Sequence, residues 1–385
     1  MPSGFRPLRV LMVACRYIPY TGGVETHVYE VGRRLVRAGV EVTVLTTDVS
    51  GQLPVFEESE GIRICRVRAW PEKKDYFFAP GIYRFIRQER WDLVHCQGYH
   101  NLVPPLAMLA AWRAAMPFVL SFHSGGNVSG LRKALRGMHW KALRPLLAQA
   151  HKLIAVSQFE ANFFQERLHL PKEQFVIIPN GAYLCEETGQ AQGAVPTEAA
   201  VEDARKDPLI VSIGRLERYK GHQRLIEALP EVLAEVPNAR VRIVGTGPYE
   251  ATLRKIARSL KVDEYVEIRP VSTEDRGGMA ALLSRADLIT LFSEYESQGI
   301  AVMEALALRR PVLVASTSAL RELINRDLAY GIPLHSPPQE VARAIVDQLR
   351  NPLKPGDAEL PTWDACASNL LALYRTVARR PVCVS

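Results

Sequence analysis

The fold is decided by residues 286–316, which read ADLITLFSEYESQGIAVMEALALRRPVLVAS. Two apolar runs, 286–293 and 311–316, enclose a glycine at position 299 and a stretch with helical periodicity. A buried strand, a turn, a helix and a second buried strand are the parts of a parallel α/β unit. The segment therefore predicts a parallel sheet whose strands are joined by helices.

The same alternation continues over almost the whole chain. Apolar, strand-like runs separated by helical patterns occur at 8–15, 40–47, 62–70, 92–98, 118–123, 152–157 and 175–180, and again at 208–214, 240–245 and 265–270. Such strands are typical of doubly wound sheets with helices on both faces. The intervening residues 185–207 are polar and small and contain Pro and Gly, which predicts a linker. We therefore predict an α/β protein with two Rossmann-like lobes, residues 1–184 and 208–362.

The composition excludes several classes of protein. With 385 residues the chain exceeds the size at which a single core keeps growing, which agrees with two domains. No apolar run approaches the ~20 residues of a membrane-spanning helix. The first apolar run, 8–15, is interpreted as a buried strand and not as a signal peptide. The six cysteines have neither disulfide-scaffold nor zinc-site spacing, which favours a reducing, cytoplasmic location.

The net charge of +7 arises in the first half of the chain, where no Asp or Glu occurs between Leu93 and Phe159. Within that stretch, residues 131–146 have an amphipathic helical pattern, with an apolar face of Leu131, Leu135, Met138, Ala142 and Leu146 and a second face of Lys133, Arg136, Trp140 and Arg144. Such a helix suits either peripheral contact with an anionic membrane, at the inner face, or ordinary packing with a basic outer face. No nucleic-acid-binding module accompanies the charge, so nucleic acid is not an expected partner.

Ligands of doubly wound sheets bind at the carboxyl ends of the strands. Four predicted strand ends carry residues suited to an anionic ligand, namely glycines that admit a phosphate, cations that neutralise it, and a histidine. These residues are Gly22 and Gly23, His123, Arg215 and Lys220, and Gly245 and Gly247. Each of them alone is compatible with an ordinary turn or a surface charge, but their joint position at strand ends predicts a binding site.

Two carboxylates, Glu296 and Glu304, stand eight positions apart around Gly299. A helix that begins there would present unpaired N–H groups and a partial positive charge to an anion such as a diphosphate. The carboxylates beside it would then bind the hydroxyl groups of a ribose or a hexose. The alternative is that Glu304 is a polar-face residue and Gly299 an ordinary turn.

In this order, the motifs resemble those of the retaining glycosyltransferases of glycosyltransferase family 4, which have the GT-B fold. The resemblance extends from about residue 8 to residue 378. The matching segments are PYTGGVETHVYEVGRRLVRAGVEVTVLT, DLVHCQG, FHSGG, LIAVSQFEANFF, VIIPNGA, IGRLERYKG, RIVGTGP and the pair of glutamates with seven residues between them. The resemblance also implies that a terminal helix, 363–380, completes the N-terminal lobe.

The resemblance implies that the C-terminal lobe binds a UDP- or GDP-sugar. Glu304 would hold the ribose hydroxyls, and the backbone near Gly245 and Arg269 would contact the base. The diphosphate would be held by two cations and by backbone amides, those of Arg215, Lys220, Gly23, Gly299 and Ile300.

The two catalytic residues that the resemblance implies are Glu296 and His123. Glu296 would orient the donor sugar, and His123 would lie over that sugar near the anomeric carbon. Ser297 and Gln298 would line the donor sugar; the family pattern is Gly or Ser followed by Phe, and here Gln298 replaces the Phe, which leaves the sugar's identity open. The N-terminal lobe would supply the acceptor site.

The implied activity is transfer of a hexosyl-type sugar with retention of configuration, in the synthesis of a polysaccharide, glycolipid or other glycoconjugate. No cofactor is expected besides the donor, and no metal, because no DxD-like pair stands at a strand end while Arg215 and Lys220 can stabilise the leaving group. Two alternatives stay open. One is a phosphorylase or sugar-nucleotide epimerase of the same fold, although no pyridoxal-phosphate lysine motif is evident. The other is a non-catalytic nucleotide-sugar-binding scaffold.

Overall fold

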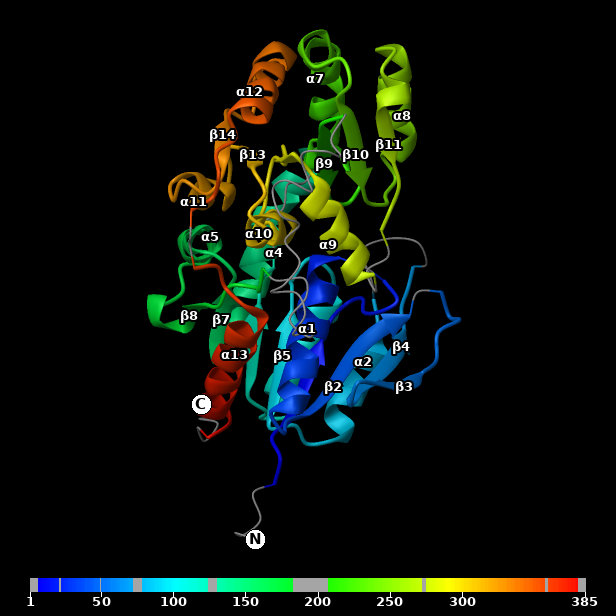
Figure 1. The fold of residues 1–385 in the computed structure, drawn as a ribbon. Helices are drawn as coiled ribbons and strands as arrows, with labels where there is room; N and C mark the ends of the chain where they lie inside the picture. Colours follow the sequence, from blue (N-terminus) through cyan, green and yellow to red (C-terminus); the bar gives the residue numbers. More distant parts are fainter. Residues whose placement is uncertain are drawn as a thin grey trace. The chain divides into compact units, whose positions relative to one another are not determined.

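The computed structural model describes residues 6–20, 22–48, 50–71, 78–123, 130–182, 207–271, 275–356 and 359–379, with the side chains of 130–138 excepted. The chain folds into two compact units (Figure 1). The first unit is Met1–Asn180 with Pro361–Ser385, and the second is Gly181–Leu360. The predicted linker, 185–207, lies outside the described residues except for Asp207.

The first unit is built on a sheet with the strand order β3-β4-β2-β1-β5-β6-β7-β8. Its strands are β1 (Arg9–Val13), β2 (Glu41–Asp48), β3 (Phe56–Ser59), β4 (Ile62–Arg68), β5 (Leu93–Gln97), β6 (Phe118–Ser121), β7 (Lys152–Ala155) and β8 (Phe175–Ile177). All neighbours are parallel except β3, which pairs antiparallel with β4. The edge strand β3 was not predicted, because FEES is a short, mostly exposed segment without an apolar run.

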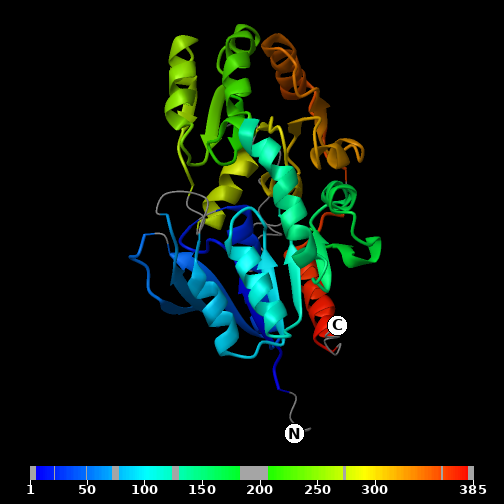
Figure 2. The same ribbon diagram turned by 180° about the vertical axis from the view of Figure 1, so that it is seen from behind.

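The helices of this unit cover both faces of the sheet. They are α1 (Gly23–Arg37), α2 (Pro80–Gln88), α3 (Val103–Arg113), α4 (Gly130–Leu147), α5 (Gln158–Leu168) and α13 (Trp363–Ala378). Helices α1 and α13 lie on the face seen in Figure 1, whereas α2, α3 and α4 lie on the face seen in Figure 2. On the latter face, residues such as Leu11, Val94 and Leu120 form a buried cluster with side chains of these helices, which stabilises the sheet.

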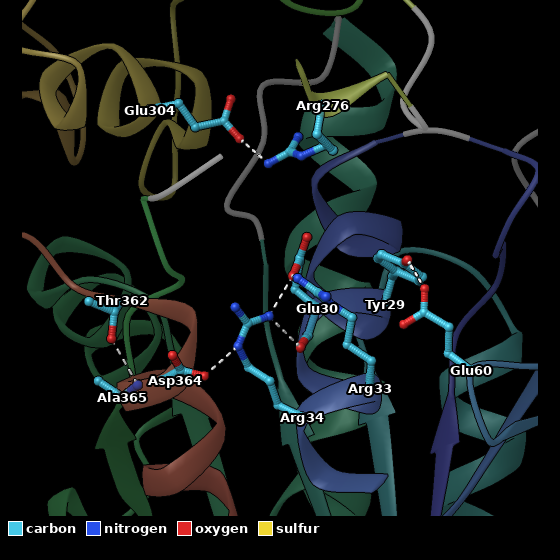
Figure 3. A network of polar contacts seen from close by, with 10 residues as sticks. All are labelled: Tyr29, Glu30, Arg33, Arg34, Glu60, Arg276, Glu304, Thr362, Asp364 and Ala365. Atoms are coloured by element: carbon cyan, nitrogen blue, oxygen red, sulfur yellow. Dashed lines mark hydrogen bonds and ion pairs between the residues drawn. The ribbon is translucent and has the colours of Figure 1, made fainter. Parts of the chain in front are cut away.

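Helix α13 packs along α1 through large apolar and charged side chains. The Trp363 and Tyr374 side chains are fully buried, and Arg34 Nε of α1 donates to Asp364 Oδ1 at 2.7 Å (Figure 3). Thr362 begins the helix, since its side chain accepts a hydrogen bond from the Ala365 N–H at 3.0 Å. The last helix is therefore part of the first unit's fold.

Helix α4 corresponds to the amphipathic pattern at 131–146, but the predicted faces were wrong in its second half. Ala142 is exposed, whereas Leu143 and Leu147 are buried. Trp140 turns toward α5, with its ring 5.8 Å from that of Phe163. The reason is that Trp140, Leu143 and Leu147 follow an i, i+3, i+7 stripe that buries more apolar area than Ala142 could. Contact between this helix and a membrane stays a prediction.

The second unit has a fully parallel sheet with the order β11-β10-β9-β12-β13-β14. Its strands are β9 (Leu209–Ile213), β10 (Arg240–Val244), β11 (Val266–Ile268), β12 (Leu288–Leu291), β13 (Val312–Ala315) and β14 (Tyr330–Ile332). The order runs outward from β9 to β11 and then resumes on the other side of β9 with β12. The gap between β9 and β12 is therefore a topological switch point, where open α/β sheets bind ligands.

Helices cover both faces of this sheet as well. They are α7 (His222–Glu235), α8 (Glu250–Ser259), α9 (Arg276–Arg285), α10 (Ile300–Ala307), α11 (Leu320–Ile324) and α12 (Pro338–Arg350). One buried cluster joins α7, α8 and α12 to the sheet, and a second joins α9, α10 and α11. These layers confirm the predicted class, two doubly wound α/β lobes. None of the helices in the described part of the chain combines the length and apolarity needed to cross a membrane.

Candidate functional site

The switch point of the second unit carries an ion pair between two of the predicted residues. Lys220 follows β9 and Glu296 follows β12, and these strands are neighbours in the sheet. Lys220 Nζ donates to Glu296 Oε1 at 2.6 Å, and the Ser293 hydroxyl donates to the same oxygen at 2.7 Å. Because only 17% of the Lys220 side chain and 11% of the Glu296 side chain are exposed, the pair is shielded from water and salt.

Close backbone packing holds this pair in register. Gly221 has φ +77°, and a Cβ there would lie 2.1 Å from the Phe292 carbonyl oxygen. The Glu294 N–H donates to Tyr219 O at 2.8 Å. Only glycine lets the loop after β9 approach the end of β12 this closely. These contacts fix the backbone of the loop after β9 against the end of β12, and so hold Lys220 and Glu296 near each other.

The loop after β13 contributes hydroxyl groups to the same place. Ser318 Oγ accepts from the Glu296 N–H at 2.8 Å, and Thr317 Oγ1 donates to Ser293 O at 3.2 Å. Ser293 and Ser318 were not predicted as site residues. Their positions gave a signal, since Ser293 is the last residue of the predicted strand 286–293 and Ser318 follows the predicted strand 311–316 by two residues, but hydroxyl residues are common at strand ends.

The second predicted carboxylate, Glu304, has a different partner. It lies on α10, is 5% exposed, and accepts from Arg276 Nη2 of α9 at 2.8 Å (Figure 3). Arg276 was not predicted, because it stands at the first turn of a helix far from any motif. The two glutamates are thus paired with separate cations, which agrees with separate roles and not with an acid/base couple.

Four predicted site residues lie between the two glutamates in the sequence: Ser297, Gln298, Gly299 and Ile300. Gly299 is the N-cap of α10 with φ +82°, and Ile300 is the first helical residue. Their amides therefore belong to the positive end of the helix dipole. Ser297 is partly exposed, and Gln298 is buried at 7% exposure.

Arg215, Gly245 and Arg269 follow β9, β10 and β11. Arg215 is exposed and donates to the Tyr219 hydroxyl at 2.8 Å. A Cβ on Gly245 would lie 1.9 Å from Gly214 O, so the ends of β9 and β10 touch there. Arg269 lines a cavity of about 560 Å³ over β10 and β11, whose lining includes neither Lys220, Glu296 nor Glu304. The structure thus groups Lys220 with Glu296 and leaves Arg269 at the edge of the sheet.

A buried histidine supports the turn after β9. His222 Nε2 lies 3.3 Å from Arg215 O, and its Nδ1 lies 2.9 Å from Ser212 Oγ. Burial lowers the pKa of His222 to about 4, so the ring is neutral at pH 7. Nε2 then donates to the carbonyl and Nδ1 accepts from the hydroxyl. His222 was not predicted either, although it directly follows the predicted cation Lys220 and Gly221.

In the first unit, His123 follows β6 and Gly23 is the first residue of α1. His123 has φ +51°, which is uncommon for a residue other than glycine, and its Nε2 lies 2.7 Å from Gln97 Oε1 at the end of β5. The His27 ring of α1 is 4.5 Å away. Burial, and then the neighbouring His27 and His95, hold the pKa of His123 well below 6.5.

His27 and His95 extend this histidine cluster. His27 Nδ1 lies 2.7 Å from Asn180 Oδ1, and burial lowers the pKa of His27 to about 4. His95 is fully buried between Tyr374 OH, at 2.5 Å from Nδ1, and Ser121 Oγ, at 2.8 Å from Nε2. Among the described residues, no group of three or more His, Cys, Asp or Glu side chains is arranged to hold a metal ion.

Comparison with known proteins places this chain in a family. The model of Glycosyltransferase Family 4 matches residues 21–184, and that of Glycosyl transferases group 1 matches residues 196–359. An uncharacterised glycosyltransferase of Methanocaldococcus jannaschii is 27% identical over 96% of this chain and 98% of its own. The D-inositol 3-phosphate glycosyltransferase of Nocardiopsis dassonvillei is 28% identical over 92% of this chain and 89% of its own.

Solved structures agree on the fold. Sucrose-phosphate synthase from Thermosynechococcus elongatus superposes with a TM-score of 0.71 at 20% identity, covering 96% of each chain. Anabaena HepE in complex with UDP and glucose gives a TM-score of 0.68 at 17% identity, covering 97% of each chain. WaaG, a glycosyltransferase of lipopolysaccharide biosynthesis, gives 0.68 at 18% identity, covering 96% of this chain and 98% of its own. The chain therefore belongs to the GT-B glycosyltransferases of family 4, group 1, and is a transferase.

Proposed function

We propose that the enzyme transfers a hexosyl-type sugar from UDP- or GDP-sugar to an acceptor hydroxyl, with retention of configuration and without a metal ion. The observation that carries this proposal is the Lys220–Glu296 pair at the switch point. It joins a cation suited to a diphosphate and a carboxylate suited to sugar hydroxyls in one rigid group. The product would be a polysaccharide, glycolipid or other glycoconjugate.

The proposed diphosphate site consists of Lys220, Arg215 and the first amides of α10, those of Gly299 and Ile300. These groups would neutralise charge that develops as the nucleotide diphosphate departs, in place of a metal ion. Gly23, at the start of a helix in the first unit, is a further proposed phosphate ligand. A helix N-terminus and fixed cations need no reorganisation during the reaction, which is the physical basis of their effect.

The proposed sugar and ribose ligands are the two glutamates. Both donors assigned to Glu296, Lys220 and Ser293, bind Oε1, so Oε2 is proposed to accept from hydroxyls of the transferred sugar. Ser297 and Gln298 would line that sugar. Glu304, oriented by Arg276, would accept from the ribose hydroxyls, while backbone near Gly245 and Arg269 would contact the base. His123 would contact the transferred sugar.

The proposed reaction proceeds on one face of the sugar. The bond between the anomeric carbon and the phosphate oxygen breaks, and its electron pair leaves with the nucleotide diphosphate. The acceptor oxygen forms its bond to the anomeric carbon on the same face, and the acceptor proton passes to the leaving phosphate oxygen. No carboxylate nucleophile is required. This scheme predicts that the anomeric configuration of the donor is kept in the product.

The test is a panel of UDP- and GDP-sugars with candidate acceptors, followed by NMR of the product's anomeric proton. D-inositol 3-phosphate belongs in the acceptor panel, because the name of the relative from N. dassonvillei specifies it. We expect transfer with retention that is unchanged by EDTA. Inversion would contradict the mechanism, and loss of activity with EDTA would contradict metal independence. Nucleotide binding without turnover of any donor would favour the scaffold alternative.

Peripheral contact of residues 131–146 with an anionic membrane at the cytoplasmic face is a second proposal, supported by the basic residues of this segment. Co-sedimentation with vesicles should increase with the fraction of anionic lipid and decrease with salt. Binding that changes with neither the fraction of anionic lipid nor the salt concentration would contradict an electrostatic contact.

A further inference from the structure

The contact between Gln97 and His123 carries information about the protonation state of the histidine ring. Gln97 Oε1, a carbonyl oxygen, lies 2.7 Å from His123 Nε2. With the Gln97 amide in this orientation its carbonyl oxygen accepts a hydrogen bond, so Nε2 carries the proton. The ring is neutral because burial opposes its charged form, so Nδ1 has no proton and retains a lone pair.

The surroundings of His123 keep this arrangement in place. The other titratable groups that act on the ring are His27 from α1 and His95 from β5, and both have lowered pKa values because they are buried. His27 donates from Nδ1 to Asn180, and its buried Nε2 receives no hydrogen bond from any described residue. A second neutral imidazole 4.5 Å away therefore offers His123 no negative charge that would favour protonation.

The backbone at this position is also constrained. His123 has φ +51° shortly after β6, a conformation that is unfavourable for a residue with a side chain. Such strain persists where the surrounding structure over-determines it. Here Gln97, at the end of the neighbouring strand β5, fixes the ring from one side.

We propose that Gln97 is a positioning residue that holds His123 as the Nε2–H tautomer, so that Nδ1 accepts a hydrogen bond from a hydroxyl group of a bound sugar. The role of Nδ1 rests on the proposed function, whereas the tautomer does not. Gln97 does not itself contact the reacting atoms in this scheme. It acts by making one nitrogen of His123 a donor and the other an acceptor.

The tautomer can be measured on the unmodified protein by long-range 1H–15N NMR of the imidazole groups, with His123→Asn used to assign the signals. The expected result is a neutral His123 ring with its proton on Nε2 at pH 7. In Gln97→Leu the signals should shift toward a mixture of tautomers. A proton on Nδ1 in the wild-type protein would overturn the proposal whether or not a donor has been found.

The kinetic test uses Gln97→Glu, with the same charge change at exposed Gln88 of α2, Gln88→Glu, as the matched control. A carboxylate beside the ring raises the pKa of His123, so Nδ1 becomes a donor at neutral pH. We expect kcat at pH 7 to fall about tenfold or more, the factor for one lost hydrogen bond. It should recover as the pH rises through the raised pKa. Gln88→Glu should follow the wild-type pH profile.

If kcat of Gln97→Glu varied with pH in parallel with kcat of the wild-type enzyme, the role of the tautomer in turnover would be overturned. Failure of every donor in the panel would instead count against the proposed function and leave the NMR result standing. Circular dichroism of each variant distinguishes a folded protein with altered kinetics from a misfolded one.

Discussion

Lys220 and Glu296 form a 2.6 Å ion pair across the point at which the strand order of the second unit reverses. They are 76 positions apart in the chain, and the end of β9 and the end of β12 bring them together. Ser293 shares the same carboxylate oxygen, and Ser318 fixes the backbone of Glu296. Hydrogen bonds with Lys220, Ser293 and Ser318 therefore hold Glu296 in a defined position.

We predict that Glu296→Gln lowers kcat about 100-fold or more, because an amide cannot accept as strongly from sugar hydroxyls or pair with Lys220. The affinity for UDP or GDP, measured by calorimetry, should change little. Lys220→Gln should do the reverse and weaken nucleotide binding. Lys255→Gln, an exposed lysine of α8, is the control. Equal activity of Glu296→Gln and wild type would contradict the proposed sugar contact.

We predict that Arg276→Met destabilises the protein by about 3 kcal/mol, because it takes from the buried Glu304 carboxylate the cation that it contacts at 2.8 Å. The matched control is Arg350→Met, whose pair with Glu235 has both side chains more than half exposed. That change should cost less than about 1 kcal/mol. All five tryptophans lie in the first unit, so urea unfolding should be followed by circular dichroism and not by fluorescence. Similar losses of unfolding free energy in both variants would show that the Arg276–Glu304 pair stabilises the protein no more than an exposed ion pair does.

We predict that Gly245→Ala destabilises the second unit by about 3 kcal/mol or more, because its Cβ would overlap the Gly214 carbonyl oxygen at 1.9 Å. The obstacle is backbone, so no side chain can move to relieve it. Gly356→Ala in the same unit has no heavy atom within 4 Å of the added Cβ and should be close to neutral. Thermal unfolding of the two variants checks the difference. A neutral Gly245→Ala would mean that β9 and β10 do not meet this closely.

The buried histidines predict that acid destabilises the first unit. The pKa of His27 is about 4 in the folded protein, against about 6.5 when unfolded. Between these values the unfolded state binds more protons, so stability is full above about pH 6.5 and is lost as the pH falls toward 4. Through His27 alone, the free energy of unfolding should fall by about 2 kcal/mol between pH 7 and pH 5.

His95 and His123 act in the same direction, since burial lowers the pKa of both. Urea unfolding followed by tryptophan fluorescence reports this unit selectively. In His27→Gln the free energy of unfolding should depend less steeply on pH, by up to one proton fewer taken up on unfolding. An unchanged slope in this variant would mean that His27 is not buried in its neutral form.

We predict that Tyr374→Phe destabilises the first unit by about 1–3 kcal/mol, because it leaves the buried His95 Nδ1 without the hydroxyl that it contacts at 2.5 Å. Tyr330→Phe, at a tyrosine that is 42% exposed in β14, should be within about 0.5 kcal/mol of wild type. Tryptophan fluorescence reports the first change, and circular dichroism reports the second. Equal stability of Tyr374→Phe and wild type would mean that the Tyr374–His95 contact does not stabilise the docking of helix α13.

Much of the fold could be predicted because apolar periodicity is local. The run LRVLMVAC contains β1, and ADLITLFS contains β12, each within a few residues of its predicted bounds. The edge strands β3 and β14 were missed because short, half-exposed strands lack a continuous apolar run. The faces of α4 were misassigned because periodicity alone does not say which neighbour a stripe meets.

The candidate site shows the same division. Lys220 and Glu296 were predicted as separate ligands, since both follow strands. That they pair with each other could not be predicted, because it depends on β9 and β12 being neighbours. Arg276 and Gln97 were missed for the same reason: each is ordinary in sequence and acquires a role only from the side chain opposite to it.

The sequence by itself determined the α/β class, the strand ends and the residue types placed there, because burial of apolar side chains and the needs of turns act over a few residues. Only the tertiary structure decided which of those residues meet. Lys220 joins Glu296, Arg276 joins Glu304 and Gln97 joins His123, because strand order and helix packing bring distant segments within hydrogen-bonding distance. The charge environment of the two glutamates, the tautomer of His123 and the orientation of these side chains follow from those contacts.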